Sequence, residues 1–299
     1  MKKNATTYVT FLLLMLPAAC SREPALPDLT SIPWIQQYGY GNDELFPVIS
    51  GKTVPGPQIR VTAGNERQFL LIDVNTIDLF IKENAFPDAD FEPQRMSNRL
   101  IENNELMVEE GYLHNVKLLN SDFPILYAAM IKQSSRPFHP KGIVGRNFLV
   151  GNQMTIDMRN NLIAFSGEPS VPLTDLAADS SLIPFSTKNL NSEHDGLLKF
   201  HCRINGRPTL ATLSTRNYTT RISGDLARVI TGKSTPAGVT LESLQIGNRT
   251  IYGLKCAVSH DLITLEPENN ESIGIIIGMD VIGQHLWTID FINSQILVE

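Results

Sequence analysis

The 299-residue chain has few cysteines, three in all, and few charged residues, which make up 19% of it. It contains no Cys-x-x-Cys pair, no His-Glu-x-x-His sequence and no close grouping of histidine, cysteine and carboxylate residues. Metal centres in proteins generally rest on such groupings, so we expect no metal and no cofactor. Basic clusters interleaved with aromatic residues are missing too, and the formal net charge is −6. A nucleic-acid partner is therefore not expected.

Long apolar runs are also scarce. Lys2 and Lys3 precede a mostly apolar stretch, residues 8–17, that is too short to span a bilayer as a lone helix. The stretch ends in Leu-Pro-Ala-Ala-Cys and resembles a bacterial lipoprotein signal, with Cys20 as the lipidated first residue of the mature chain. This resemblance implies a lipid-anchored protein of the bacterial cell envelope, on the periplasmic face of the outer membrane. An ordinary secretory signal with a chance cysteine is the alternative.

What the chain does contain is a pattern that occurs twice. Residues 69–81 (FLLIDVNTIDLFI) and 210–222 (LATLSTRNYTTRI) each indicate a buried strand, a polar turn and a second apolar run. Asp73 lies at the first turn and Ser214 at the second. A Gly-Asn or Asn-Gly dipeptide, typical of tight hairpins, precedes each turn. Two long copies of one pattern predict a two-lobed molecule.

The repeat continues downstream, in the sequences IVGRNFL and IIGMDVI. Gly145 precedes Asp157 by 12 positions, and Gly278 precedes Asp290 by 12 positions. Each of these aspartates follows Thr-Ile and precedes a polar turn, where an aspartate commonly caps its own turn. We interpret both as structural residues.

A strand that ends in a carboxylate turn, followed downstream by apolar-apolar-Gly-x-Asn/Asp-apolar, resembles the aspartic proteases. The sequence IVGRNFL is especially similar to the segment that follows the flap in retroviral proteases. The resemblance covers roughly residues 51–299 and implies two fused retropepsin-like repeats. The implied fold is mainly β and bilobal, pepsin- or retropepsin-like, with two β-barrel-like lobes related by a pseudo-twofold axis. It also implies that Asn147 and Asp280, after the glycines, form hydrogen bonds within their own lobes.

We expect five segments along the chain. They are a signal peptide (1–20), a tether (21–50), an N-terminal lobe (51–168), a linker (169–195) and a C-terminal lobe (196–299). In the tether, Trp34 and Tyr38 either dock on a lobe or belong to a mobile spacer. The candidate flap tips are Asn103-Asn104 in the first lobe, where a solvated surface loop is the alternative, and residues 236–238 in the second.

Two cysteines remain if Cys20 carries lipid. Cys202 and Cys256 both lie in the C-terminal lobe, on strands that can be neighbours. An oxidising envelope permits a disulfide between them, and two buried thiols acting as small apolar groups are the alternative.

In the aspartic proteases each lobe carries Asp-Thr/Ser-Gly. Two adjacent carboxylates share a proton, one acting as a base on water and the other as a hydrogen-bond donor to the scissile carbonyl. The Thr hydroxyls brace the two turns, and the Gly admits the substrate backbone. By this resemblance Asp73 is the remnant of the first catalytic position, and Ser214 is a degenerate second position that has no carboxyl proton to share.

The neighbouring positions depart from the motif as well. Val74 replaces one bracing Thr, Thr215 keeps the other, and Asn75 and Arg216 replace the two glycines. We expect half of the brace to be lost and the substrate backbone to be obstructed. Asn75, Thr76, Thr215 and Arg216 are the candidate binding residues. Arg216 either pairs with Asp73 across the cleft, favouring its ionised form, or points to solvent.

Three functions remain open. The first is a catalytically degenerate envelope lipoprotein that holds a peptide or another envelope protein in the interlobe cleft. The second is an active aspartic-type endopeptidase that uses Asp73 with a non-standard partner, including one from a second copy of the chain. The third is a scaffold lipoprotein with no cleft ligand. We expect a monomer that meets the membrane through its lipid anchor.

Overall fold

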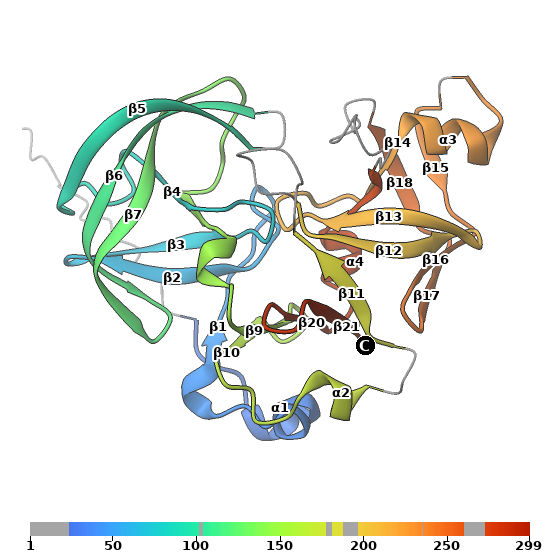
Figure 1. The fold of residues 1–299 in the computed structure, drawn as a ribbon, viewed down its shortest axis with the longest axis horizontal. Helices are drawn as coiled ribbons and strands as arrows, with labels where there is room; N and C mark the ends of the chain where they lie inside the picture. Colours follow the sequence, from blue (N-terminus) through green and yellow to red (C-terminus); the bar gives the residue numbers. More distant parts are fainter. Residues whose placement is uncertain (1–23, 102–103, 178–180, 188–196, 235, 260–272) are drawn as a thin grey trace, which may run out of the picture.

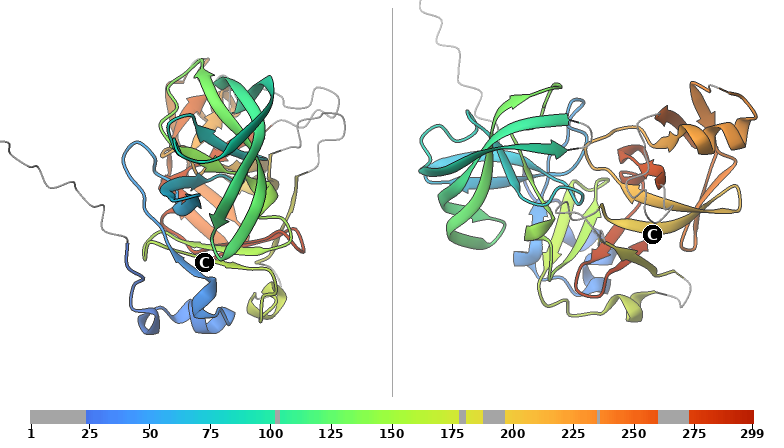
Figure 2. Two further views of the ribbon diagram at one scale, coloured as in Figure 1. Left: turned by 90° about the vertical axis from the view of Figure 1, so that its left-hand side faces the viewer. Right: turned by 45° about the horizontal axis from the view of Figure 1, so that its top comes forward.

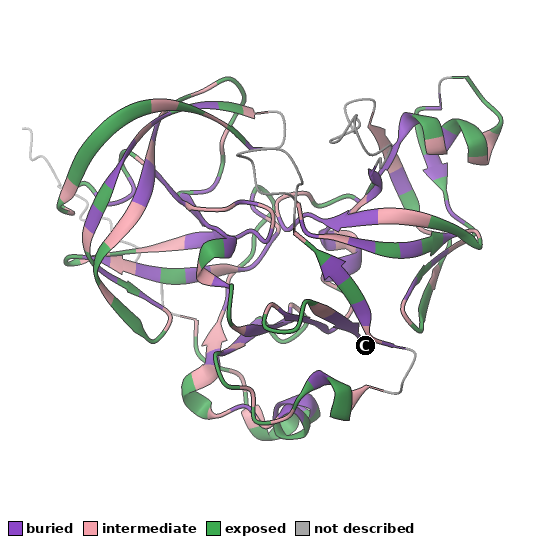
Figure 3. Ribbon diagram, viewed as in Figure 1, coloured by how far each residue is buried: buried purple, intermediate pink, exposed green. Residues whose placement is uncertain are grey.

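The computed structural model describes residues 24–101, 104–177, 181–187, 197–234, 236–259 and 273–299. The protein is mainly β, with two lobes side by side and a layer of strands and short helices beneath them (Figure 1). Buried residues concentrate inside the lobes and in the layer of strands beneath (Figure 3). The predicted bilobal, mainly β fold is confirmed.

The N-terminal lobe is a seven-stranded sheet that closes on itself, because β2 pairs with both β3 and β6. Side chains alternate along its strands, as in β2, where Ile59 and Val61 are buried and Arg60 is exposed. In spatial order the strands are β2 (Gln58–Ala63), β3 (Glu66–Ile72), β8 (Gly142–Val144), β4 (Leu79–Lys82), β7 (Ser121–Ser134), β6 (Asn104–Leu118) and β5 (Phe91–Ile101).

The C-terminal lobe has a sheet of similar plan and one two-turn helix. Its strands are, in spatial order, β12 (Lys199–Ile204), β13 (Arg207–Leu213), β19 (Ile273–Ile277), β14 (Arg221–Ser223), β18 (Lys255–Ser259) and β15 (Gly238–Thr240), with the hairpin of β16 (Ser243–Ile246) and β17 (Arg249–Tyr252) joined to β12. The helix α3 (Gly224–Thr231) begins where the Ser223 hydroxyl accepts a hydrogen bond from the Leu226 amide. It ends at Gly232, whose φ of 68° is left-handed.

The layer beneath is a base sheet of six strands to which both lobes contribute. In spatial order these are β1 (Leu45–Pro47), β10 (Leu162–Ser166), β9 (Gln153–Asp157), β20 (Trp287–Asp290), β21 (Gln295–Val298) and β11 (Ile183–Ser186). At its centre β9 and β20 pair antiparallel, and the hydroxyls of Thr155 and Thr288 lie 2.9 Å apart. The base sheet therefore joins the two halves of the chain.

Asp157 and Asp290 close the two hairpins of the base sheet. Asp157 accepts hydrogen bonds from the amide and side chain of Asn160, and Asp290 accepts them from the amide and side chain of Asn293. Their predicted role as turn caps is confirmed.

The segment predicted as a tether is instead built into the fold from Asp28 onward. It forms η1 (Leu29–Ser31), α1 (Pro33–Tyr38), η2 (Asn42–Glu44) and β1. Trp34 donates from Nε1 to Asp157 at 2.7 Å, and Tyr38 donates from its hydroxyl to Glu299 at 2.6 Å. Aromatic side chains with one polar atom stabilise such a docked segment, because they bury apolar surface and satisfy the polar atom as well. Figure 2 shows the helices of this segment on the outer side of the base sheet.

Part of the predicted linker is also structured, as α2 (Leu173–Leu176) and β11. The candidate flap tip at residues 236–238 is wrong: α3 precedes it, and Gly238 opens β15. Cys20 and Asn103 lie outside the described residues, and Asn104 opens β6. Among the helices that are described, none is both long and apolar enough to cross a bilayer.

Cys202 and Cys256 are both free and buried. Cys202 lies on β12 and Cys256 on β18, and three strands, β13, β19 and β14, separate these two in the sheet order. The prediction of neighbouring strands is wrong, and the thiols act as small core side chains. Burial raises the pKa of each thiol to about 12, which disfavours the reactive thiolate.

Candidate functional site

The two turns predicted to carry the site sit in the same strand arrangement in each lobe. β8 lies between β3 and β4, parallel to the first and antiparallel to the second. In the other lobe β19 lies between β13 and β14 in the same way. The Asp73 amide donates to the Val144 carbonyl at 3.1 Å, and the Ser214 amide donates to the Ile277 carbonyl at 2.8 Å. Equivalent main-chain bonds therefore hold both turns.

The glycine that follows each inner strand allows this close approach. A Cβ on Gly145 would lie 2.4 Å from the carbonyl oxygens of Ile77 and Asp78. A Cβ on Gly278 would lie 2.7 Å from the carbonyl carbon of Thr219. Any other residue would push the strand-to-helix segment away from the polar turn.

Short helices follow the glycines, η3 (Arg146–Phe148) and α4 (Met279–Ile282). Asn147 donates from its side chain to Asp78 at 3.0 Å, and Asp280 accepts from the amide and hydroxyl of Thr220 at 2.9 and 2.6 Å. The expectation that Asn147 and Asp280 form hydrogen bonds within their own lobes is confirmed.

The two turns meet at the lobe interface and brace each other from both sides. The Thr215 hydroxyl donates at 2.6 Å to the carbonyl of Ile72, the residue before Asp73. In return, the Asn75 side-chain amide donates to the carbonyl of Leu213, the residue before Ser214. The expectation that half of the brace is lost with Val74 is therefore wrong, because Asn75 supplies the missing donor.

Asn75 is held still further into the C-terminal lobe. Its side-chain oxygen accepts from the Leu198 amide at 2.9 Å, and its Nδ2 lies 3.1 Å from the Thr212 hydroxyl. These bonds commit the side-chain amide of Asn75 to the other lobe. The Asn75 side chain can form these hydrogen bonds, whereas that of Val74 cannot, because asparagine carries both a donor and an acceptor.

Asp73 is fully buried beneath Arg216. Asp73 has 0% exposure, and one of its carboxylate oxygens accepts from the Asn75 amide at 3.0 Å. The other oxygen accepts from the Thr76 hydroxyl at 2.8 Å and lies 2.8 Å from the Nε of Arg216. The Arg216 side chain is itself only 14% exposed. The pairing of Arg216 with Asp73 is confirmed, and the alternative of a solvent-directed arginine is wrong.

Ser214 is buried as well, with 0% exposure. Its hydroxyl accepts from the Asn217 side chain at 2.8 Å. Asn217 follows Ser214 by three positions, as Thr76 follows Asp73, so the repeat contained a signal for this contact that the sequence analysis missed. Thr76 and Asn217 therefore each donate a hydrogen bond to the first residue of their own turn, Asp73 and Ser214.

The hydrogen bonds and the ion pair described above show how the four candidate binding residues are used. Asn75, Thr76 and Thr215 bond within the protein, and Arg216, whose side chain is 14% exposed, pairs with the buried carboxylate. A single carboxylate with a guanidinium on it and a hydroxyl at the facing position has no pair of acids to share a proton. Asp73 itself has no exposed surface in this arrangement.

A long hairpin of β5 and β6 arches over the N-terminal lobe, one end directed toward the second lobe (Figure 1). Ile101 pairs with Asn104 at that end, which fits the predicted flap, and the turn itself lies outside the described residues.

The same hairpin carries a cluster of charged side chains. Glu110, which is 1% exposed, accepts hydrogen bonds from Arg95 at 2.6 Å and from Arg99 at 2.7 Å. Burial raises the pKa of Asp78, near the site, and the charge of Arg99 opposes this.

Comparison with protein families and with curated proteins finds no match. Among solved structures, the aspartic proteinase from Irpex lacteus has a similar fold, with a TM-score of 0.57 and 12% sequence identity. The similarity covers 85% of this chain and 96% of that one. At such low identity the likeness establishes the fold alone, that of a bilobal, pepsin-like aspartic proteinase.

Proposed function

We propose that this protein is a non-catalytic, aspartic-protease-like lipoprotein of the bacterial envelope that binds an extended peptide, or a segment of another envelope protein, between its lobes. One observation carries the first part of the proposal. Arg216 lies 2.8 Å from Asp73 and covers it, and Ser214 stands at the facing position. The usual chemistry needs two carboxylates that share a proton and hold a water between them, whereas here position 214 is a serine and Asp73 has no exposed surface.

The binding role is supported by the features around Asp73 that remain although the second carboxylate is missing. Asn75 and Thr215 hold the two turns together, and the β5/β6 hairpin extends toward the second lobe. Extended peptides suit such a place, because hairpin and cleft edges offer main-chain pairing. Arg216, rather than Asp73, is then the side chain that a ligand meets at the floor.

The same arginine also favours a second candidate, a scaffold lipoprotein with no cleft ligand. Arg216 fills the floor of the interlobe site where a ligand would otherwise contact the turns. The two candidates differ in whether peptides bind the purified protein at all.

One assay separates these functions and also tests for proteolysis. The purified soluble form is incubated with a diverse peptide library between about pH 3 and 7, a range that covers the ionisation of a carboxylate pair, and both bound and cleaved peptides are identified. We expect binding without cleavage, and weaker binding in Arg216→Ala. No bound peptide would favour the scaffold, and cleavage that Asp73→Asn abolishes would establish an active endopeptidase.

The lipid anchor is tested separately at Cys20. If the signal resemblance is right, Cys20→Ser leaves the protein unprocessed or releases it from the membrane fraction, and Cys202→Ser, the matched control, stays there. Because lipid chains contribute roughly 0.8 kcal/mol per buried methylene, their loss removes the anchor. Membrane association that persists in Cys20→Ser contradicts this assignment.

A further inference from the structure

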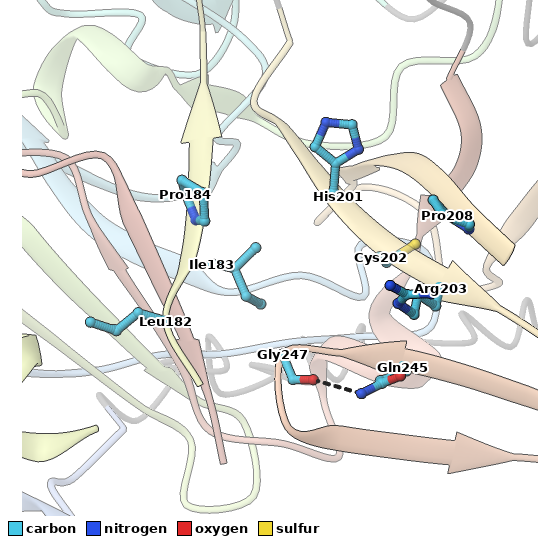
Figure 4. A pocket seen from close by; sticks show the side chains of 9 residues that line it. All are labelled: Leu182, Ile183, Pro184, His201, Cys202, Arg203, Pro208, Gln245 and Gly247. Carbon is cyan, nitrogen blue, oxygen red and sulfur yellow. Dashed lines mark hydrogen bonds between the residues drawn. The ribbon is translucent and has the colours of Figure 1, made fainter. Parts of the chain in front are cut away.

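A hollow of about 290 Å³ lies in the C-terminal lobe, apart from the residues that contact Asp73 and Ser214 (Figure 4). It opens between β11 on one side and β12 and β16 on the other. Its apolar wall consists of Leu182, Ile183, Pro184, Pro208 and the side chain of Cys202. Arg203, also on β12, supplies its one permanent positive charge.

The hollow exists because β12 changes partners along one edge. Phe200 pairs with β11, and Arg203 pairs with β16. Between these contacts β11 and β16 diverge, which leaves a gap beside Cys202 (Figure 4).

The two sides of the gap are fixed against each other at their far end. Gly247, in the turn after β16, lies so near the start of β11 that a Cβ on it would be 2.7 Å from the Ser181 carbonyl oxygen. The Gln245 side chain donates to the Gly247 carbonyl at 3.2 Å and stiffens the same turn. A ligand would therefore enter a pocket that is already formed, which lowers the entropic cost of binding.

The charge of Arg203 is the feature that points to a ligand. Its Nη1 donates to the Gly206 carbonyl at 3.1 Å, which holds the guanidinium in place. Across the described ranges Arg203 makes no ion pair with any carboxylate. The imidazole of His201 is directed away from the gap between the strands (Figure 4). A guanidinium bonds carboxylates in a fixed geometry, so an oriented arginine beside an apolar wall favours an anion with an apolar body.

We propose that this pocket binds a carboxylate attached to a small apolar group, either a free short-chain acid or the C-terminal residue of a peptide. Since a water occupies about 30 Å³ in the liquid, the hollow has room for on the order of ten non-hydrogen atoms. This is the size of a six-carbon acid or of one leucine with its carboxylate. The carboxylate would lie on Arg203 and the apolar group against Ile183 and Pro184.

The test is a titration of the purified soluble form at neutral pH by calorimetry and by amide NMR. The probes are hexanoate and hexanamide, together with a peptide that ends in a free leucine carboxylate and the same peptide ending in leucine amide. We expect both carboxylates to bind and to shift the amide signals of Cys202, Gln245 and Gly247. The neutral forms should bind at least about tenfold more weakly, the loss of roughly one charge-assisted hydrogen bond. Whichever carboxylate binds more tightly identifies the source.

The variant Arg203→Gln should weaken hexanoate binding by the same factor. Its matched control is Arg221→Gln, an exposed arginine on β14 that does not line the hollow. Both positions are on the surface, so neither change should unfold the protein. The proposal is overturned if neither carboxylate binds, if hexanamide binds as tightly as hexanoate, or if Arg203→Gln leaves the affinity unchanged.

Discussion

Arg216 and Asp73 form a charge pair with very little contact to water. Removal of one partner from such a pair leaves an uncompensated buried charge, which typically costs about 3 kcal/mol or more. We expect Arg216→Ala to lower the free energy of unfolding by about 3 kcal/mol, and Asp73→Asn in the same chain to recover part of that loss, because the remaining group is then neutral. Urea denaturation measures both. A stability of Arg216→Ala equal to that of the parent protein would contradict a buried pair.

Arg216 also determines how many substitutions are needed before the site can cleave peptides. Ser214→Asp alone should give no cleavage, because Arg216 still covers Asp73. In Ser214→Asp with Arg216→Gly, two carboxylates face each other in a braced site, and we expect acid-dependent peptide cleavage at least about tenfold above that of the single variant. The rate is measured on a fluorogenic peptide library. As a control, Asp73→Asn in the double variant must abolish the activity, and a folded but inert double variant would show that other losses matter.

The residues at the head of the two site turns could be predicted from the sequence, but the contacts that the neighbouring side chains make across the lobe interface could not. Asp73 and Ser214 follow from the repeat, since equal spacing places equal turns. The compensation of Val74 by Asn75 depends on where a side chain points across an interface between distant segments, and no local pattern contains that direction. For the same reason the separation of Cys202 and Cys256 was missed.

Among the elements, the β5/β6 hairpin contains a buried carboxylate, Glu110, that pairs with Arg95 and Arg99. Burial alone would raise the pKa of Glu110, but hydrogen bonds from Ser97, Arg95 and Tyr127 and the charge of Arg99 outweigh it and lower the pKa from an ordinary 4.5 to about 2. A carboxyl whose pKa is lower in the folded chain stabilises the fold fully above its unfolded pKa. This stabilisation is then lost as the pH falls from 4.5 toward 2.

We therefore expect Glu110→Gln to reduce stability near neutral pH and to flatten the fall in stability below pH 4.5. Thermal unfolding of the variant and the parent, followed as a function of pH, measures this. The control is Glu105→Gln, an exposed carboxylate on the same strand that should leave the profile unchanged. Parallel profiles for Glu110→Gln and the parent would rule out the low pKa.

Elements with strong local patterns were easier to predict than those that depend on docking. The strands around the two turns follow from alternating and continuous apolar runs. The segment with Trp34 and Tyr38 is short and rich in proline, which by composition resembles a spacer. Its order comes from partners far along the chain, Asp157 and Glu299, and composition cannot report those.

At the scale of the whole molecule, the lobes are joined near the site by Asn75 and Thr215. Asn75→Ala removes the hydrogen bonds to Leu198, Thr212 and Leu213 of the C-terminal lobe, and we expect a loss of about 2 kcal/mol in the free energy of unfolding. Addition of Thr215→Val, which removes the bond to Ile72, should cost less than the sum, since both changes open one interface.

Hydrogen exchange measures the local effect. We expect the backbone amides of β3 and β13 to exchange faster in both variants, and those of the outer strands to change less. The control is Asn98→Ala, on exposed β5. Equal exchange rates of the β3 and β13 amides in all three variants would contradict the brace.

The base sheet also constrains when this protein can fold. Its central pair joins β9 to β20, and the last strand, β21, lies between β20 and β11. While the chain is still being made, the docking place of β9, β10 and the segment around Trp34 is incomplete until β20 and β21 have been synthesised. Pairing across such long stretches of sequence is slow. Under the export that we propose, this late pairing would keep the chain open for passage through a membrane channel.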